Sequence, residues 1–229
     1  MIATFVFDPF VEMVVYPAGV LETVIAGLGN GFLYALVAIG FVIIFKSSSV
    51  FNFAQGAMVF FAALNFAGMI KLGFPWYVAG LVSLLIMVVL AFVVERVVLR
   101  PLVGQDGLSL FMATIGVSFF VEGLVEAVWG GDPHLLKIGL PESAIFTLDY
   151  PWGQSMGLDI IIQESDLLAI GIGIVMIVGL YFFFQYSKVG RALRAVADDH
   201  AASMSIGIPL NQMWVVVWAL SGFTAFVAA

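Results

Sequence analysis

The stretch 35-ALVAIGFVIIFKSSSVFNFAQGAMVFFAALNFAGMIK-71 contains two long apolar runs that are separated by a short polar segment. The polar segment, residues 47–58, holds Ser48, Asn52 and Gln55 but no charged residue. On a helix these side chains stand at i, i+4 and i+7, and therefore form one stripe. We predict that a second helix begins within this segment, that a serine caps its N-terminus, and that the stripe faces the interior of a helical bundle.

The apolar residues of the same segment complete this prediction. Val50, Phe51 and Phe53 fall away from the polar stripe and are left for lipid and for packing. A re-entrant turn between the two apolar runs is the alternative to a helix start. Both interpretations make the segment an interruption at the edge of a membrane.

The composition of the whole chain is that of a membrane protein. Hydrophobic residues make up 63% of its 229 residues and charged residues only 10%, whereas soluble domains are about half apolar and a quarter charged. A soluble α/β protein would show apolar runs of roughly 4 to 8 residues, but these runs approach the ~20 residues that cross a bilayer. Six such segments occur: residues 24–45, 50–70, 76–94, 108–128, 166–186 and 213–229.

These segments predict the fold class. We expect an all-α, polytopic transmembrane helical bundle with about six spans, which forms a single domain over residues 1–229. The last segment ends at Ala229 without a polar flank, so we expect the natural chain to continue beyond it.

The sequence lacks the residues on which several protein classes depend. It has no cysteine, which removes disulfide bonds, cysteine-ligated zinc and thiol catalysis. It has no phosphate-binding loop of the form G-x-x-x-x-G-K-[ST], and its two histidines, His134 and His200, fall in loops on opposite sides of the expected membrane. The net charge of −7 would argue against nucleic-acid binding in a soluble protein, whereas in a membrane protein the sidedness of the charge matters more; we expect no nucleic-acid partner. We therefore predict a protein without catalysis, metal or cofactor of its own; an intramembrane enzyme that depends on Ser118 or Glu122 is a distant alternative.

The basic residues predict the orientation, because cytoplasmic loops carry an excess of Lys and Arg. With the N-terminus outside, only Lys71 and Lys137 fall in outer loops. We therefore place the N-terminus and the loop 129–165 outside, and the segment 187–212 in the cytoplasm. The basic residues that then lie inside are Lys46, Arg96, Arg100, Lys188, Arg191 and Arg194.

The two long loops carry different patterns. The outer loop is acidic and turn-rich, and the alternation at residues 147–162 suggests short strands or a cap. This loop is either a passive connector or a docking surface for an external partner.

In the inner loop, residues 190–204 are good helix formers, Arg191 and Arg194 lie one turn apart, and Gly207 is a stop signal. We expect one short amphipathic helix parallel to the membrane; a basic membrane anchor is the simpler alternative.

Polar residues also occur inside the expected spans, where they usually face protein or water. Thr114, Ser118, Glu122 and Glu126 follow one another at four-residue steps, which keeps them within about 120° of one helix face. They form either a polar lane along a path or hydrogen-bonding contacts between helices.

The first span carries a second polar pair and a pair of glycines. Asn30 and Tyr34 lie one turn apart and are candidates to line a path. Gly27 and Gly31 form a small-residue pair that permits close helix packing.

Four motifs in sequence carry a family resemblance: NFAQG at 52–56, ERVVLRPL at 95–102, ATIG at 113–116 and GRALRAVADD at 190–199. Together they resemble the permease subunits of branched-chain amino acid ABC importers, whose close relatives serve urea and short amides. The likeness extends from about residue 27 to the end of the chain.

The chain departs from the family pattern at three positions. Ala57 stands where members often carry an acid, so no charge-based role is expected at this position. His200 replaces the Glu of the general importer coupling motif, and Gly207 comes one residue late. These two departures weaken the match to the general motif, but not the match to this subfamily.

The resemblance implies a multi-pass subunit of the bacterial inner membrane. Its partners would be a second, homologous permease, two cytoplasmic ABC ATPases that use the ATP, and a periplasmic substrate-binding protein. The cytoplasmic segment would be the coupling helix that docks on an ATPase. This role is carried over to Gly190, Arg191, Arg194, Asp198, Ala201, Ala202 and Gly207.

A mechanism of alternating access follows from the resemblance, and it leaves several alternatives open. Asn52 and Gln55 either contact substrate or satisfy backbone groups at a broken helix. The main rival is a stand-alone secondary transporter or channel, in which Glu122 is the only deep candidate for an ion site. The sequence does not separate branched-chain amino acids from urea, amides or aromatic acids. The expected path residues are Asn30, Tyr34, Asn52, Gln55, Thr114, Ser118 and Glu122.

Overall fold

The structure is a computed structural model, and its described residues fall into two compact units. The first unit combines Met1–Leu33 with Gly139–Val175, and the second combines Tyr34–Ile138 with Met176–Ala229. The described residues are 17–48, 51–102, 105–130, 146–147, 161–162, 164–205 and 207–229.

The described part of the chain is almost entirely helical, as the prediction of an all-α bundle requires. In a bilayer a helix satisfies its own backbone groups, which is why long apolar runs adopt it. The helices are α2 (Pro17–Ser48), α3 (Gln55–Lys71), α4 (Trp76–Val93), α5 (Gly107–Trp129), α6 (Glu164–Tyr186), α7 (Lys188–Asp198), α8 (His200–Ser205) and α9 (Leu210–Ala228). The remaining elements are a π-helix η1 (Val94–Leu99), a 3-10 turn η2 (Arg100–Leu102), and the strands β1 (Phe146–Thr147) and β2 (Ile161–Ile162).

Within the described residues, four helical stretches are long and apolar enough to cross a membrane. They are Gly19–Ser48, Trp76–Leu102, Gly107–Trp129 and Ser165–Tyr186, which correspond to four of the six predicted spans. The other two predicted spans are helices as well. However, α3 has 17 residues and begins at Gln55, not at residue 50, and the apolar part of α9 is similarly short. The chain is therefore a multi-pass helical membrane protein.

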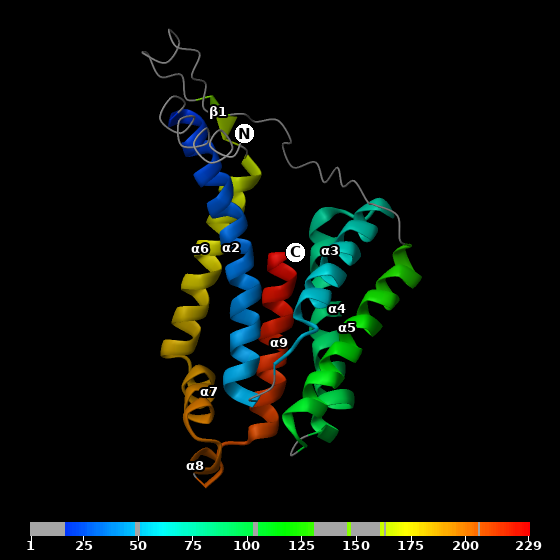
Figure 1. Cartoon of the computed structure of the whole chain (residues 1–229), viewed down its shortest axis with the longest axis vertical. Coiled ribbons are helices and arrows are strands. Elements are labelled where there is room, and N and C mark those ends of the chain that lie inside the picture. Colours follow the sequence, from blue (N-terminus) through cyan, green and yellow to red (C-terminus); the bar gives the residue numbers. More distant parts are fainter. Residues whose placement is uncertain are drawn as a thin grey trace, which may run out of the picture. The chain divides into compact units, whose positions relative to one another are not determined.

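The helices of the second unit alternate in direction (Figure 1). The α9 helix packs against α3 and α4, and α3 also packs against α5. Their contact surfaces contain apolar side chains that are fully or almost fully buried, including Met58, Met87, Val121 and Trp218. Lateral packing of this kind fixes the polar groups that lie between the helices.

The first unit joins the early part of α2 to the early part of α6. A methyl group added at Gly29 would lie 3.3 Å from the backbone of Asp166, so the two helices touch at this glycine. Among the described residues of this chain, nothing lies within 4 Å of such a group at Gly27 or Gly31, so close packing through that pair stays a prediction. Gly29 makes this contact because it lies on the buried face of α2, while Gly27 and Gly31 lie on the exposed face.

The two strands form an antiparallel pair in which Phe146 faces Ile162 and Thr147 faces Ile161. The prediction of short strands is confirmed at these described ends of the alternating stretch. The residues between them, and most of the predicted docking loop 129–165, lie outside the described residues.

Candidate functional site

The polar segment that follows α2 is a break between helices. The hydroxyls of Ser47 and Ser48 donate to the carbonyls of Ile43 and Ile44, at 2.5 and 2.7 Å, and so belong to the last turns of α2. Helix α3 begins at Gln55, and its N-cap residue makes no side-chain hydrogen bond. The predicted serine cap and the single stripe on one helix are therefore wrong. The physical reason for this difference is that a serine hydroxyl can also bond to the carbonyl one turn back in its own helix.

The aromatic residues of the break face outward. Phe51 is 48% exposed and Phe53 is 44% exposed, which confirms that these two side chains are left for lipid and packing. The Phe51 ring is tilted against Phe45 with centroids 4.2 Å apart, and the Phe53 ring meets Phe111 edge-to-face at 4.7 Å. Val50 lies outside the described residues.

Asn52 organises the turn into α3. Its side chain is fully buried, and its Oδ1 accepts a hydrogen bond from the backbone N–H of Ala54 at 3.1 Å. Its Nδ2 donates to Gln55 Oε1 at 3.2 Å, and its own carbonyl accepts from the Gln55 N–H at 3.1 Å. Asparagine stabilises turns in this way because its side chain imitates a backbone group.

Gln55 connects the start of α3 to α9. Its Oε1 accepts from Ser221 Oγ at 2.7 Å, and its Nε2 donates to the Ser221 carbonyl at 3.4 Å. Both residues are almost completely buried. Gly40 of α2 lies against the same group: a Cβ there would be 2.5 Å from Gln55 Nε2 and 2.6 Å from Thr224 Oγ1. The motif therefore ties α2, α3 and α9 together.

Thr114 of α5 donates a hydrogen bond to a backbone carbonyl of the break between α2 and α3. Its hydroxyl lies 3.2 Å from the carbonyl of Phe51 and 2.9 Å from that of Phe111, and the residue is fully buried. Together, Asn52, Gln55 and Thr114 are engaged by protein groups in this conformation. Asn52 and Thr114 bond to backbone groups at the break, whereas the side chain of Gln55 bonds across to Ser221 of α9.

The remaining polar residues of α5 are more accessible. Ser118 Oγ donates to Glu122 Oε1 at 3.2 Å, and both residues are half-buried. Glu126 is exposed one turn further along α5. The predicted lane therefore exists on one helix, but its inner end at Thr114 is closed by packing.

The last two predicted path residues lie on an open face of α2. Asn30 is exposed and Tyr34 is 76% exposed. Because they are one turn apart on a continuous helix, they lie on the same face.

The amphipathic helix α7 is fixed to the end of α6. Ser187 is its N-cap and accepts a hydrogen bond from Gly190 N at 2.8 Å. A Cβ at Gly190 would come within 2.4 Å of the Phe183 carbonyl and 2.6 Å of Phe184 Cα, so only glycine fits. The buried face of α7 continues with Leu193 and Val196, and α7 also packs against α9.

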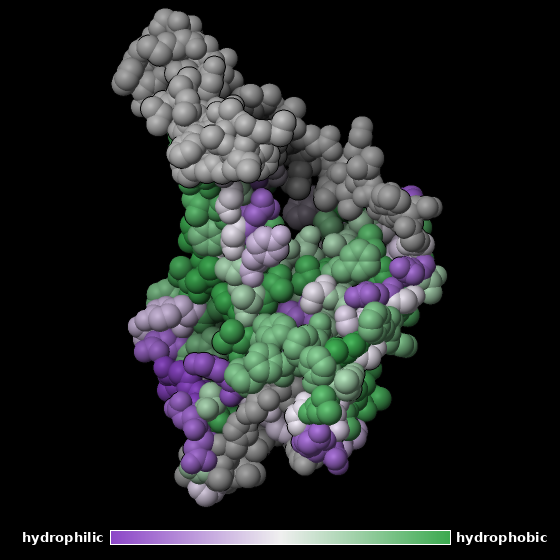
Figure 2. Space-filling view, in the orientation of Figure 1, coloured by the Kyte–Doolittle hydropathy of each residue, from purple (hydrophilic) through white to green (hydrophobic). Residues whose placement is uncertain are grey.

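Two arginines of α7 bind the end of α6. Arg191 Nη1 donates to the Tyr186 carbonyl at 2.8 Å. Arg194 donates to Gln185 through Nη1 to Oε1 at 2.6 Å and through Nη2 to the carbonyl at 3.3 Å. These carbonyls belong to the last turn of α6, where backbone acceptors have no partner within the helix and favour positive charge. Both arginines remain exposed, and Figure 2 shows hydrophilic residues gathered over this part of the molecule.

The prediction of one short amphipathic helix over residues 190–204 is wrong, because the chain forms two helices that meet at Asp199. This residue has an extended backbone, with φ −155° and ψ 111°, and its Oδ1 accepts from Ala202 N at 3.0 Å. Aspartate is a strong N-cap residue, so the second Asp of the pair starts α8 and does not continue α7. Gly207 has φ +86° and, as predicted, stands just beyond the end of α8.

The predicted coupling residues lie on two short helices, α7 and α8, and at Gly207 beyond them. Gly190 is buried at the α6–α7 contact, while Arg191, Arg194 and Asp198 lie on the exposed face of α7. Ala202 is exposed on α8, and the side chain of Ala201 lies outside the described residues.

Sequence reasoning missed a buried ion pair in the ERVVLRPL motif. Glu95 is 1% exposed, and its Oε1 accepts from Arg100 Nη2 at 2.9 Å and Nε at 3.0 Å. The two residues are five apart, and they meet in a region where η1 has the wider turn of a π-helix. Within the described part of the chain, Glu95 Oε2 is buried without a hydrogen-bond partner. The change in helix type was the missing information, because an α-helix brings residues three or four apart together.

Ser221 and Thr224 were also missed. Two hydroxyl residues, three positions apart in an otherwise apolar run, are the signal that would have found them. Such residues in membrane helices commonly make hydrogen bonds across helices.

Comparison with known proteins assigns the family. The family model described as the branched-chain amino acid transport system permease component matches residues 23–229. The permease protein BraD of Pseudomonas aeruginosa, from a high-affinity branched-chain amino acid transport system, is 27% identical over 91% of this chain and 69% of its own length. The corresponding LivH of Escherichia coli is 26% identical over 91% of this chain and 68% of its own length.

A further relative has a slightly lower identity. It is a probable branched-chain amino acid transport permease protein LivH of Methanocaldococcus jannaschii, 24% identical over 86% of this chain and 61% of its own length. No solved protein structure matches the chain. The family model covers most of the chain, including the break before α3, the ion pair and α7. This chain belongs to the branched-chain amino acid transport permease family, whose members are transport subunits and not enzymes.

Proposed function

We propose that this chain is the permease subunit of an ATP-driven importer that moves branched-chain or related amino acids across the bacterial inner membrane by alternating access. Its proposed partners are a second permease, two cytoplasmic ABC ATPases and a periplasmic binding protein. The observation that carries the proposal is the attachment of α7 to α6 through Gly190, Arg191 and Arg194. An exposed helix that is attached to a membrane helix can transmit a movement of a partner subunit to that membrane helix.

The distribution of basic residues supports the proposed orientation. In Figure 1, the end of α2, the α4–α5 connection and α7 lie at one end of the second unit. These elements carry Lys46, Arg96, Arg100 and the basic residues of α7, whereas Lys71 ends α3 at the opposite end. An excess of positive charge favours the cytoplasmic side.

A mechanical route from α7 to the bundle supports the proposed coupling. The α7 helix packs against α9, and α9 holds Gln55 at the start of α3 through Ser221. Because packed helices move as stiff bodies, a displacement of α7 acts on both α6 and α9. The break between α2 and α3 is then a place where the bundle can change shape without breaking a helix.

Two alternatives are weighed against this proposal. Urea or amide transport is disfavoured because the curated relatives named above carry branched-chain amino acid names. A stand-alone secondary transporter would use Glu122, which is half-buried and accepts a hydrogen bond from Ser118. Such a transporter would not need an exposed, anchored α7.

Reconstitution of the chain with its partner subunits tests the proposal. We expect Arg191→Glu combined with Arg194→Glu to reduce binding-protein-stimulated ATP hydrolysis at least tenfold, because the change reverses the charge of the docking face. The matched control is Lys71→Glu with Arg96→Glu, which makes the same change in charge at exposed residues outside α7. Unchanged stimulation in the α7 variant would refute the coupling role. A wild-type chain that never retains an ATPase in mild detergent would refute the importer itself.

A further inference from the structure

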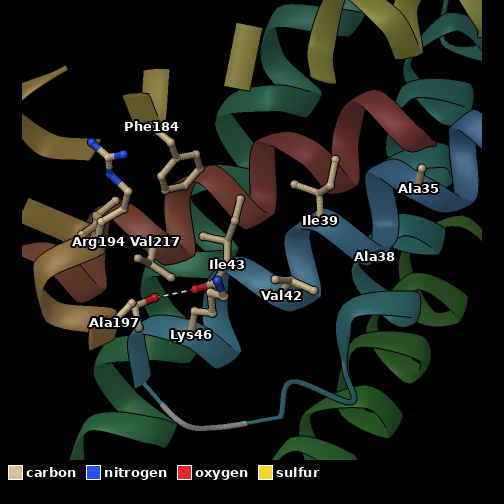
Figure 3. A pocket seen from close by; sticks show the side chains of 12 residues that line it. Ala35, Ala38, Ile39, Val42, Ile43, Lys46, Phe184, Arg194, Ala197 and Val217 are labelled. Atoms are coloured by element: carbon tan, nitrogen blue, oxygen red, sulfur yellow. Dashed lines mark hydrogen bonds between the residues drawn. The ribbon is translucent and has the colours of Figure 1, made fainter. Parts of the chain in front are cut away.

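A cavity of about 580 Å³ lies in the second unit beside α7 (Figure 3). Its long wall is a row of apolar side chains on α2, among them Ala35, Ala38 and Val42. Lys46 and Arg194 lie at one end of this row. The volume falls within the range of roughly 300 to 1,000 Å³ that is typical of sites for small organic molecules.

The length of the apolar wall matches one leaflet of a membrane. From Ala35 to Lys46 the helix rises about 16 Å, at roughly 1.5 Å per residue. Half of a ~30 Å hydrocarbon core is ~15 Å. If Lys46 stands at the level of the headgroups, the wall therefore reaches about the middle of the bilayer.

The charges at the cavity select the kind of molecule that it can hold. Among the described residues, the only ion pair joins Glu95 and Arg100, so no described carboxylate neutralises Lys46 or Arg194. Arg194 does donate to Gln185, but this partner is neutral. Both cations are exposed, and none of the described residues that line the cavity is acidic.

These properties exclude two simpler occupants. A free amino acid carries an ammonium group, which would face two cations and no carboxylate in this cavity. An apolar helix of a second subunit would cover Lys46 and Arg194 and remove water from two positive charges that no described carboxylate neutralises, which is unfavourable. A molecule with a long apolar tail and an anionic head satisfies both ends of the cavity.

We propose that this cavity is a binding site for an anionic phospholipid. One acyl chain lies along Ala35, Ala38 and Val42, and the phosphate group lies between Lys46 and Arg194. Lys46 belongs to the last turn of α2 and Arg194 to α7, so the bound lipid links the two helices. Basic pockets beside membrane helices on the cytoplasmic side are a recurring form of lipid recognition.

Native mass spectrometry of the full chain in mild detergent tests the site. Phosphatidylglycerol is compared with phosphatidylcholine that has the same acyl chains. We expect the wild type to retain phosphatidylglycerol preferentially. We expect Lys46→Gln to lower its affinity about fivefold, and Lys46→Gln with Arg194→Gln about 25-fold, since each cation contributes about fivefold.

Three control variants separate charge from folding. Lys71→Gln with Lys188→Gln removes the same charge from exposed residues that do not line the cavity, and retention should stay unchanged. Lys46→Arg keeps the charge and should keep the preference. Ala38→Trp fills the apolar wall and should reduce the retention of both lipids.

Two results would overturn the proposal. The first is a wild type without preference for phosphatidylglycerol, or a double glutamine variant that retains this lipid as well as the wild type does. The second is a protein occupant. Because the chain has no cysteine, Val42→Cys gives a unique thiol at the cavity, and its efficient oxidation to a disulfide-linked pair of chains would indicate a second copy.

Discussion

Ser221 donates its hydroxyl hydrogen to Gln55 Oε1 at 2.7 Å, and Gln55 Nε2 donates in return to the Ser221 carbonyl at 3.4 Å. The two residues are 166 positions apart in the chain and almost completely buried. This reciprocal contact explains why a polar motif stands between two apolar runs. Gln55 closes the start of one membrane helix against the middle of another.

The first prediction concerns this contact. Gln55→Leu removes both hydrogen bonds with Ser221 and the one that Gln55 Oε1 accepts from Asn52 Nδ2. Because the buried Ser221 hydroxyl and Asn52 amide then lose this acceptor, the free energy of unfolding should fall by about 1–3 kcal/mol. Equilibrium unfolding in detergent measures the change. In a double-mutant cycle with Ser221→Ala, the double variant should be more stable than the sum of the single effects predicts. Strict additivity would mean that the contact contributes nothing.

The second prediction concerns the junction between α6 and α7. Gly190→Ala places a methyl group 2.4 Å from the Phe183 carbonyl, so we expect a loss of about 1–3 kcal/mol from overpacking. The control is Gly179→Ala in α6, where nothing lies within 4 Å of the new methyl group. Because alanine is the better helix former, the control should be neutral or more stable by up to about 1 kcal/mol. Equal thermal stability of the two variants would contradict the close contact.

The third prediction concerns the buried ion pair. Arg100→Met leaves the Glu95 carboxylate buried without its cation, which should destabilise the protein by about 3–5 kcal/mol. Glu95→Leu combined with Arg100→Met should recover most of this loss, because the uncompensated charge is gone. Arg96→Met is the control at an exposed neighbour and should stay within about 0.5 kcal/mol of the wild type. Chemical unfolding in detergent distinguishes the four proteins.

Apolar run length and stop signals were sufficient to predict the helices, because both act locally. They identified α4, α5 and α6 within a few residues and placed Gly207 beyond the end of a helix. The start of α3 was misplaced, because serines such as Ser47 and Ser48 occur both in the last turn of one helix and at the start of the next. Local pattern does not decide which of two adjacent helices a hydroxyl serves.

Contacts between helices were less predictable. The periodicity of α5 gave the face that carries Thr114, but it did not indicate that this hydroxyl binds the Phe51 carbonyl. The contact between Glu95 and Arg100 coincides with a π-helix, and the partnership of Gln55 with Ser221 depends on how α3 packs against α9. Such partners are set by tertiary packing. The periodicity of residues within one helix does not identify the residues that they meet on another helix.

Cysteine cross-linking tests the proposed role of the chain most directly, because the wild type has no cysteine. Single cysteines at Arg191, Arg194 and Ala202 lie on exposed positions of α7 and α8, and Tyr34→Cys is the exposed control on α2. In membranes that contain the assembled transporter, we expect at least one of the three to form a disulfide with a cysteine-bearing ATPase subunit. Tyr34→Cys should form none. Failure at all three positions, or a disulfide between Tyr34→Cys and the ATPase, would contradict the account.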